Sequence, residues 1–279
     1  MKNVLTVLLL TYNHAPWIER CIKSVLEQKT DFPFQIWIAD DASTDGTSDI
    51  VRKYAALDSR ITPFIQKENT KGTHFLDRLA AVDTEFFTVV EGDDFWCDSE
   101  KLQLQVDALK RHPNCSMCTC NTMVYEKGVP KKPLKRPLRF GRKEKEFGFW
   151  HAFYTHTASR VYRSALFPLN DKEKMSFIAW DDAMRFYALD KGKMIYLNRI
   201  MSVYNMTGSG AFSSMSLEER AISAMQANLR LDRFFNGKYS KYFHKHYPYP
   251  REKYLFKLTL PYSRTGRIQF ALKKYKTEN

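Results

Sequence analysis

The chain has 279 residues, of which 44% are hydrophobic and 27% are charged, as in an ordinary globular protein. This composition excludes a disordered chain, a collagen and a low-complexity protein. No apolar run approaches the ~20 residues that a membrane-spanning helix needs, and the apolar residues 4–10 lack the cleavage site of a signal peptide. The five cysteines form no even framework of pairs, which favours free thiols in the reducing cytoplasm.

The net charge of +13 is concentrated near the C-terminus. Residues 230–279 hold 13 Lys or Arg and 3 Asp or Glu, a net charge of +10, which leaves +3 for the first 229 residues. Aromatic residues alternate with these cations over residues 239–257. Such a tail suits an anionic membrane surface or a single-stranded nucleic acid, and part of it is also explained by a solvated helical face.

The first ninety residues alternate between strand and helix patterns. Residues 4–10 are continuously apolar, which is typical of a strand covered on both faces. Apolar residues recur at helical spacing over 18–26, the next strand covers 34–39, and a helix follows through 50–55. A helix through 76–80 then leads to a strand at 86–90. This order predicts an α/β fold with right-handed parallel crossovers.

The rest of the chain is less regular. Residues 128–146 are rich in Pro, Lys and Arg and are expected to form a mobile loop. We expect a helix at 180–190, a strand at 194–197 and a helix at 217–235. The cysteines at 115, 118 and 120 with His112 lack the paired spacing of a structural zinc site, so an apolar strand face explains them better.

Polar residues follow three of the predicted strands, namely Tyr12, the pair Asp40–Asp41 and the pair Asp93–Asp94. Ligands bind beyond the carboxyl ends of strands in open α/β sheets, so these residues are expected to form a site. Adjacent carboxylates suit Mg²⁺ or Mn²⁺ with a diphosphate, but aspartates also cap helices and form turns. Tyr12 has two interpretations as well, a ring that stacks on a nucleobase or one that packs at the sheet edge.

These segments together resemble the family 2 glycosyltransferases. The resemblance begins at Thr11-Tyr12-Asn13 and continues through residues 39–47 and 91–96. It ends near residue 215, after segments at 101–106, 180–182, 192–196, 202–204 and 208–210. It covers about three quarters of the chain. It implies the GT-A fold, which is a Rossmann-like, nucleotide-diphospho-sugar transferase fold with a mixed sheet flanked by helices.

The resemblance also implies roles for individual residues. Tyr12 would stack on the base and Asp41 would bond its edge at N3 of uracil or thymine, while Asp93 would contact the ribose or the sugar. Six residues would bind the donor in all: Thr11, Tyr12, Asn13, Asp41, Lys71 and Asp93.

The resemblance places the metal and the base in two further segments. Asp94 would be the chief ligand of Mg²⁺ or Mn²⁺, with Asp93 beside it. Asp181 matches the catalytic base, although Trp180 stands where the family has an acidic residue and Asp182 remains an alternative base. Two interpretations of His156 remain: contact with the acceptor or the diphosphate, and a structural role.

We therefore predict a GT-A domain over residues 1–215 and a helical, basic and aromatic extension over 216–279. The predicted activity is an inverting, Mg²⁺- or Mn²⁺-dependent transfer from a UDP- or dTDP-sugar to a saccharide or lipid-linked acceptor in surface-polysaccharide synthesis. The predicted place is the cytoplasmic face of the membrane, with peripheral contact through the tail, no nucleic acid partner, and a tail helix that would support a homodimer. Two alternatives remain open: a nucleotidyltransferase that makes sugar nucleotides, and a non-enzymatic adaptor that binds membranes or nucleic acid.

Overall fold

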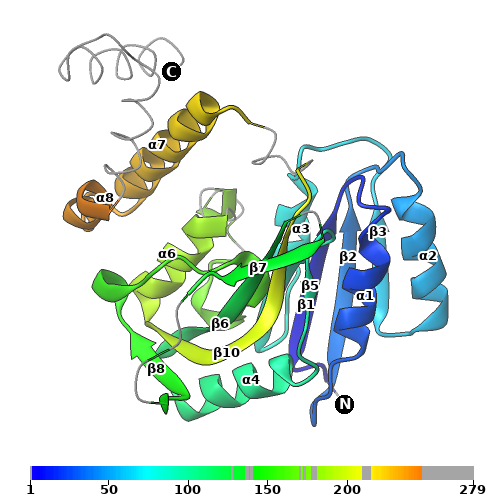
Figure 1. Cartoon of the computed structure of the whole chain (residues 1–279), viewed down its shortest axis with the longest axis horizontal. Helices are drawn as coiled ribbons and strands as arrows, with labels where there is room; N and C mark the ends of the chain where they lie inside the picture. The colour runs from blue at the N-terminus through cyan, green and yellow to red at the C-terminus, as the bar shows by residue number, and fades with distance from the viewer. Residues whose placement is uncertain are drawn as a thin grey trace. The chain divides into compact units, whose positions relative to one another are not determined.

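The structure is a computed structural model that describes residues 2–126, 128–135, 138, 141–169, 171, 174–176, 181–208 and 215–246. The chain divides into two compact units, residues 1–207 and 208–279. The first unit contains one mixed sheet with helices on both faces (Figure 1). The predicted α/β fold is confirmed, and the first unit ends at residue 207, whereas the predicted boundary is residue 215.

Ten strands form this sheet among the described residues, and eight of them follow one another in the order β3-β2-β1-β4-β9-β6-β10-β5. Strands β1 to β4 run parallel, whereas β9 is antiparallel to both β4 and β6. Short strands β7 and β8 pair with β6 and β10. The bounds are β1 (Leu5–Thr11), β2 (Phe34–Asp40), β3 (Ile61–Ile65), β4 (Phe86–Glu91), β5 (Phe95–Trp96), β6 (Cys115–Glu126), β7 (Val129–Pro133), β8 (Glu144–Phe147), β9 (Arg160–Arg163) and β10 (Lys193–Met206).

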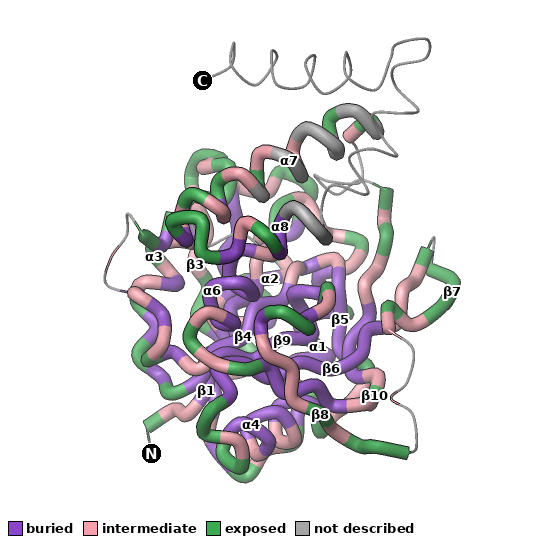
Figure 2. Tube along the Cα trace, turned by 90° about the vertical axis from the view of Figure 1, so that its left-hand side faces the viewer, coloured by how far each residue is buried: buried purple, intermediate pink, exposed green. Residues whose placement is uncertain are grey.

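The helices of this unit connect the strands and cover the sheet. They are α1 (Ile18–Leu26), α2 (Thr47–Leu57), α3 (His74–Ala80), α4 (Lys101–Arg111) and α6 (Asp181–Lys191), with short 3-10 turns η2 (Phe149–His151), η3 (Thr157–Ser159) and η4 (Ser164–Leu166). The helices predicted in α1, α2, α3 and α6 are confirmed. Figure 2 shows the central strands as one buried block, with exposed residues mainly in the loops and on the outer helix faces.

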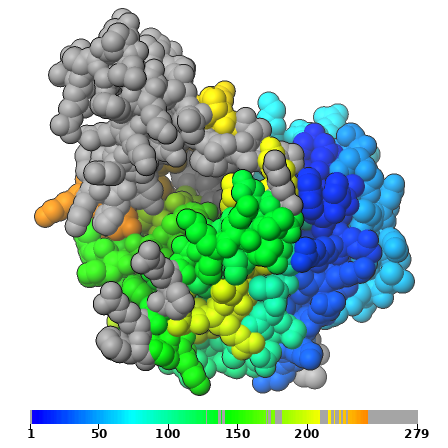
Figure 3. Space-filling view, in the orientation of Figure 1, coloured from blue at the N-terminus to red at the C-terminus, as the bar shows by residue number. Residues whose placement is uncertain are grey.

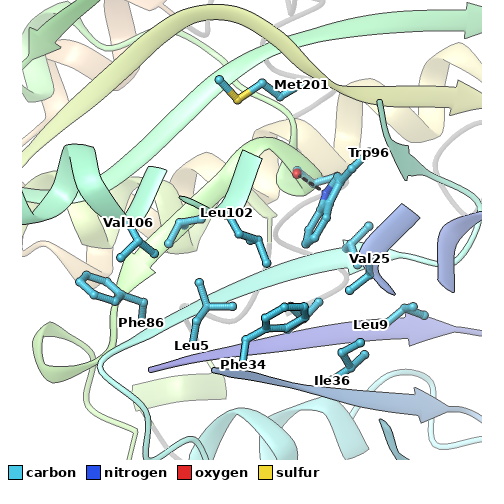
Figure 4. Close-up of a cluster of buried hydrophobic side chains, with 14 of the residues drawn as sticks. Leu5, Leu9, Val25, Phe34, Ile36, Phe86, Trp96, Leu102, Val106 and Met201 are labelled. Atoms are coloured by element: carbon cyan, nitrogen blue, oxygen red, sulfur yellow. Dashed lines mark hydrogen bonds between the residues drawn. The ribbon is translucent and has the colours of Figure 1, made fainter. Parts of the chain in front are cut away.

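The core follows from the register of the parallel strands. Leu5 pairs with Phe34 on one side and Phe86 on the other, so the three side chains form one row on the same sheet face. Helices α1 and α4 cover this face with apolar residues such as Val25 and Val106 (Figure 4). These residues are buried almost completely, and each large side chain contributes ~1.5–3 kcal/mol to folding.

The opposite face is closed mainly by aromatic rings. Phe87 of β4 stacks on Tyr162 of β9 with ring centroids 5.1 Å apart, and Phe167 packs edge-on against both rings. Phe167 also contacts Tyr187 of α6 at 5.2 Å. These contacts fix β9 and the turns beside it against β4, the strand that leads into the turn with the paired aspartates.

The cysteines of β6 lie in the core, as the strand interpretation predicts. Cys115, Cys118 and Cys120 are buried free thiols, and burial raises the pKa of Cys115 and of Cys120 to about 11. His112 bonds two glutamates of β8 through its two ring nitrogens instead of facing these thiols. The predicted apolar strand face is therefore confirmed for these three cysteines.

The prediction of a mobile loop over residues 128–146 is wrong in part. Residues 129–133 form β7 and pair antiparallel with β6, while residues 144–147 form β8 and pair antiparallel with β10. Both are polar strands at the margin of the sheet, where Lys and Pro are tolerated because one side of the backbone is unpaired. Figure 3 shows green atoms of the part around β7 beside the blue N-terminal part on the surface of the unit.

The second unit contains α7 (Leu217–Phe234) and α8 (Ser240–His246) in its described residues. A capping box starts α7, because the Ser216 hydroxyl accepts the Glu219 N–H while the Glu219 carboxylate accepts the Ser216 N–H. The predicted helix at 217–235 is thereby confirmed, and the rest of the basic tail, residues 247–279, lies outside the described residues. Among the described helices, none is both long and apolar enough to cross a bilayer.

Candidate functional site

The carboxyl ends of β1, β2 and β4 lie side by side, because β1 pairs in parallel with both neighbours. Thr11, Asp40 and Glu91 end these three strands, so the loops that carry the predicted site residues leave from the same edge of the sheet. The polar segments singled out in the sequence therefore meet in space.

Asn13 joins the loops that follow β1 and β2. Its backbone N–H donates to Ser43 Oγ at 2.8 Å, and its side-chain oxygen accepts the Thr44 N–H at 2.9 Å. The residue has a positive φ of 53°, which asparagine tolerates better than most residues. Asn13 thus supports the loop while the neighbouring Tyr12 ring remains 45% exposed, open to stacking.

The two adjacent aspartates after β2 have different roles. Asp40 is fully buried and accepts hydrogen bonds from the hydroxyls of Ser43 and Ser48, so it braces its own loop. Asp41 reaches across to the loop before α3, where it accepts the N–H of Thr70 at 2.7 Å and that of Gly72 at 2.9 Å. Of the two, only Asp41 is predicted to bind the donor, and only Asp41 contacts the loop before α3.

Hydrogen bonds keep Asp41 ionised although it is buried. Burial acts to raise the pKa of this carboxyl, but the N–H groups of Thr70 and Gly72, the Thr70 hydroxyl and the nearby His74 together hold the pKa below its usual value. The Nδ1 atom of His74 lies 3.2 Å from Asp41 Oδ1. Asp41 is therefore a fixed, charged acceptor at this edge of the sheet.

Lys71 lies at the outer side of the loop that Asp41 holds. Its φ is 56° and that of Gly72 is 83°, so the backbone turns sharply here and Lys71 is left exposed. The contacts of Asp41 with the residues on either side fix the backbone of Lys71 near the ends of β1 and β2.

Gly92 allows the turn after β4 to lie close to the end of β1. A β-carbon on this residue would come within 2.8 Å of both Thr11 Oγ1 and His14 Nδ1, closer than real contacts. The Thr11 hydroxyl is buried and has no hydrogen-bond partner among the described residues. The glycine thus brings Thr11 of the predicted donor site against the turn that carries Asp93 and Asp94.

Asp93 faces His14 of the loop after β1. Its Oδ2 lies 4.0 Å from His14 Nε2. Burial raises the pKa of Asp93 and lowers that of His14, while each group partly opposes the shift of the other. Burial therefore disfavours charge on either group. The two side chains can hydrogen-bond polar groups of a ligand.

Asp94 lies deeper, with 1% of its surface exposed. Its Oδ1 accepts the backbone N–H of Asn205 at 2.9 Å, and the Asn205 side chain donates to the Asp93 carbonyl at 3.1 Å. Asn205 of β10 therefore fixes the aspartate turn from across the sheet. No role is predicted for Asn205 from the sequence, although the neighbouring residues 202–204 are part of the resemblance.

Glu91, Asp94 and His156 form a group that fits a divalent cation. Each offers one ligand atom, and these atoms all lie within 4.8 Å of one another. Burial, together with the charge of Arg160, lowers the pKa of His156 to about 3, so its imidazole is uncharged and able to coordinate. Asp93, which was predicted as a second ligand, is not part of this group.

The two candidate bases stand at the start of α6. Asp182 Oδ1 lies 3.1 Å from Arg185 Nε and 3.6 Å from Arg160 Nη2, and both arginines are fully buried. Asp181 is the first residue of α6, and its side chain lies outside the described part of the structure, as does all of Trp180. The structure thus shows what Asp182 does and leaves Asp181 as a prediction.

Comparison with known proteins agrees with this arrangement. The profile of glycosyl transferase family 2 matches residues 6–168, more than half of the chain. The chain belongs to this family. Its membership favours the predicted transferase over the nucleotidyltransferase and the adaptor. An uncharacterized protein of Mycobacterium tuberculosis is 30% identical over 219 residues, which cover 77% of this chain and 62% of that protein. The chain therefore spans less than two thirds of this relative.

Two solved structures share the fold. The crystal structure of residues 1–349 of Staphylococcus aureus TarS with UDP-GlcNAc has a TM-score of 0.60 and 18% identity, covering 91% of this chain and 81% of that one. TarS is named a poly(ribitol-phosphate) β-N-acetylglucosaminyltransferase, and it is 27% identical over 170 residues, 60% of this chain and 28% of TarS. A mannosyltransferase of Pyrobaculum calidifontis, solved with GDP-Man and Mn²⁺, has a TM-score of 0.60 and 19% identity, covering 100% and 81% of the two chains. These likenesses confirm the predicted GT-A fold.

Proposed function

We propose that the chain is an inverting glycosyltransferase that moves a sugar from a UDP- or dTDP-sugar to a saccharide or lipid-linked acceptor in surface-polysaccharide synthesis. The observation that carries the proposal is the convergence of an exposed ring, an ionised carboxylate and two further aspartates at adjacent strand ends. Family membership and the name of TarS support a role in polymers of the cell surface.

The nucleotide base is assigned from the chemistry of Asp41. A carboxylate only accepts hydrogen bonds, and N3 of uracil or thymine carries the proton that it would accept. N3 of cytosine and of adenine carries no proton, so these bases match Asp41 less well. The exposed Tyr12 ring beside it would stack on the base.

The diphosphate end is assigned to the aspartate turn. Asp94 would hold Mg²⁺ or Mn²⁺, with Glu91 and His156 close enough to contribute, while Asp93 would meet the ribose or the sugar. A bound divalent ion would stabilise the negative charge of the nucleoside diphosphate as it leaves. The solved mannosyltransferase with Mn²⁺ supports this choice of ion.

Asp181 is assigned as the base, because Asp182 is already held by two guanidinium groups. The contacts with Arg160 and Arg185 give the Asp182 carboxylate a structural role in the fold. In the proposed reaction Asp181 takes the proton of the acceptor hydroxyl, and the hydroxyl oxygen forms a bond to the anomeric carbon. The bond from that carbon to the diphosphate oxygen breaks on the opposite face, so the configuration inverts and the nucleoside diphosphate leaves with the bonding electrons.

The base assignment is tested by turnover of UDP-GlcNAc, UDP-glucose and dTDP-rhamnose, measured as released nucleotide. We expect Asp181→Asn to lose at least ~100-fold in rate while it still binds UDP. Asp182→Asn should lower stability more than rate, since it weakens contacts within the fold. Full activity in Asp181→Asn, or no turnover of any nucleotide sugar by the wild type with a panel of acceptors, would refute the assignment.

The membrane part of the proposal rests on the charge of the tail. Residues 230–279 carry a net charge of +10 with many aromatic rings, which suits anionic lipid headgroups. We expect the full chain to float with vesicles that contain phosphatidylglycerol and to leave them in ~0.5 M salt, since screening weakens such contacts. Equal binding to neutral vesicles, or none to anionic ones, would contradict it.

A further inference from the structure

His156 is a buried histidine, and its Nδ1 atom makes no hydrogen bond to the described residues. Only 4% of the residue is exposed, and its Nδ1 is buried without a hydrogen bond to any described residue. This atom lies 3.5 Å from Asp94 Oδ2, which is longer than an ordinary hydrogen bond. A buried polar atom without a hydrogen-bond partner is unfavourable, which indicates that another group satisfies it.

The rest of the residue is held firmly. The ring stacks on Tyr204 of β10, with centroids 4.3 Å apart and an angle of 27° between the planes. The His156 carbonyl accepts both the N–H and the hydroxyl of Ser159, at 3.0 Å and 2.6 Å, at the start of η3. The imidazole is thus fixed in front of Asp94 by two elements, β10 and η3, that come from different parts of the chain.

The distances suit a cation between these side chains. Ligands of an octahedral divalent ion lie ~2.1 Å from it, so neighbouring ligands are about 3 Å apart and opposite ones about 4 Å. The 3.5 Å between His156 Nδ1 and Asp94 Oδ2 is near the first value, and the 4.8 Å limit for the three ligand atoms is near the second. Small side-chain shifts would bring all three atoms to one ion.

We propose that His156 supplies a nitrogen ligand to the divalent-cation site, with Glu91 and Asp94 as the oxygen ligands. This inference rests on the proposed function, because it concerns the ion of the donor site. Mg²⁺ and Ca²⁺ prefer all-oxygen sites, whereas transition ions accept imidazole. The site therefore selects Mn²⁺, or another first-row transition ion, over Mg²⁺.

Pulsed EPR of the full chain loaded with Mn²⁺, with and without UDP, tests this directly. We expect nitrogen modulation in the wild-type spectrum that changes when histidine is labelled with ¹⁵N, a measurement that needs no variant. His156→Gln should lose the modulation and bind Mn²⁺ at least ~10-fold more weakly, with a smaller change for Mg²⁺. His14→Gln is the matched control: its nitrogen lies 4.0 Å from Asp93, and the modulation should remain.

Absence of histidine nitrogen modulation in the wild type, with or without UDP, would overturn the inference, as would its persistence in folded His156→Gln. Either result would mean that His156 positions Asp94 without binding the ion. These outcomes are separate from failure of the proposed function. If UDP binding still required Mn²⁺ and Asp94, the function would stand and the nitrogen ligand would fail; if the modulation were present but no nucleotide bound, the reverse would hold.

Discussion

Replacing Asp41 with asparagine tests whether one carboxylate both holds the loop before α3 and reads the nucleotide base. The carboxylate accepts the Thr70 N–H and hydroxyl on one oxygen and the Gly72 N–H on the other. In Asp41→Asn one oxygen becomes an NH₂ group, which meets a donor if the side chain keeps its position. The variant therefore loses one charge-assisted hydrogen bond and weakens the other two.

The expected loss of stability follows from these contacts. A hydrogen bond to a charged group contributes ~1.5–3 kcal/mol, so one lost and two weakened bonds correspond to about 2–4 kcal/mol. Because the pKa of Asp41 is lowered in the folded state, its contribution is present above the unfolded pKa of about 4 and is lost as the pH falls through the lowered value. The difference between wild type and variant should therefore shrink from pH 7 to pH 3.

Urea unfolding gives the free energy of unfolding, and calorimetry gives UDP affinity, which should fall at least ~10-fold in Asp41→Asn. Asp58→Asn is a matched control, since Asp58 also accepts a backbone N–H and a guanidinium, both from Arg60, but precedes β3 at the opposite edge of the sheet. The control should lose stability and keep UDP affinity. Unchanged UDP affinity in Asp41→Asn, or an equal loss in Asp58→Asn, would refute the reasoning.

Three further predictions concern the turn after β4, a surface ion cluster and the thiols. Gly92→Ala should destabilise the fold by ~1–3 kcal/mol through overpacking and weaken UDP binding, whereas Gly148→Ala, whose β-carbon would meet nothing within 4 Å, should do neither. Hydrogen bonds that His112 donates to Glu144 and Glu146 raise its pKa, so His112→Gln should cost ~0.5–1 kcal/mol near pH 6 and less as the pH rises past that pKa. A constant difference in the free energy of urea unfolding up to pH 9 would contradict this. A thiol reagent should label Cys97 rapidly in the native protein, because this residue is exposed. Rapid labelling of a buried thiol would contradict the structure; the buried thiols are Cys21, Cys115, Cys118 and Cys120.

The sequence predicted the N-terminal half of the fold because local patterns decide it. Continuous apolar strands and amphipathic helices alternate over the first ninety residues, and the polar residues after the strands mark the edge where the site forms. Strands β7 and β8 were missed because Pro and Lys disfavour strands locally, and pairing with β6 and β10 creates them.

The candidate site was predictable only where its residues follow strands directly. Asp41 and Asp94 come from such positions, and the structure brings their loops together. Asn205 and His156 reach Asp94 from β10 and from the turn before β9, and their approach depends on the sheet order β4-β9-β6-β10. No local pattern in the sequence encodes that order, so their contacts with Asp94 became visible only in the fold.

The central claim is that the aspartate turn and the loops of β1 and β2 form a metal-dependent nucleotide site. Calorimetry of UDP, dTDP, GDP, CDP and ADP, each with and without Mn²⁺, tests it most directly, with Asp94→Ala measured beside the wild type. We expect that UDP or dTDP binds, that Mn²⁺ strengthens binding, and that Asp94→Ala removes the effect of the ion. Binding of no nucleotide by the folded wild type, or metal-dependent binding that survives in Asp94→Ala, would contradict it.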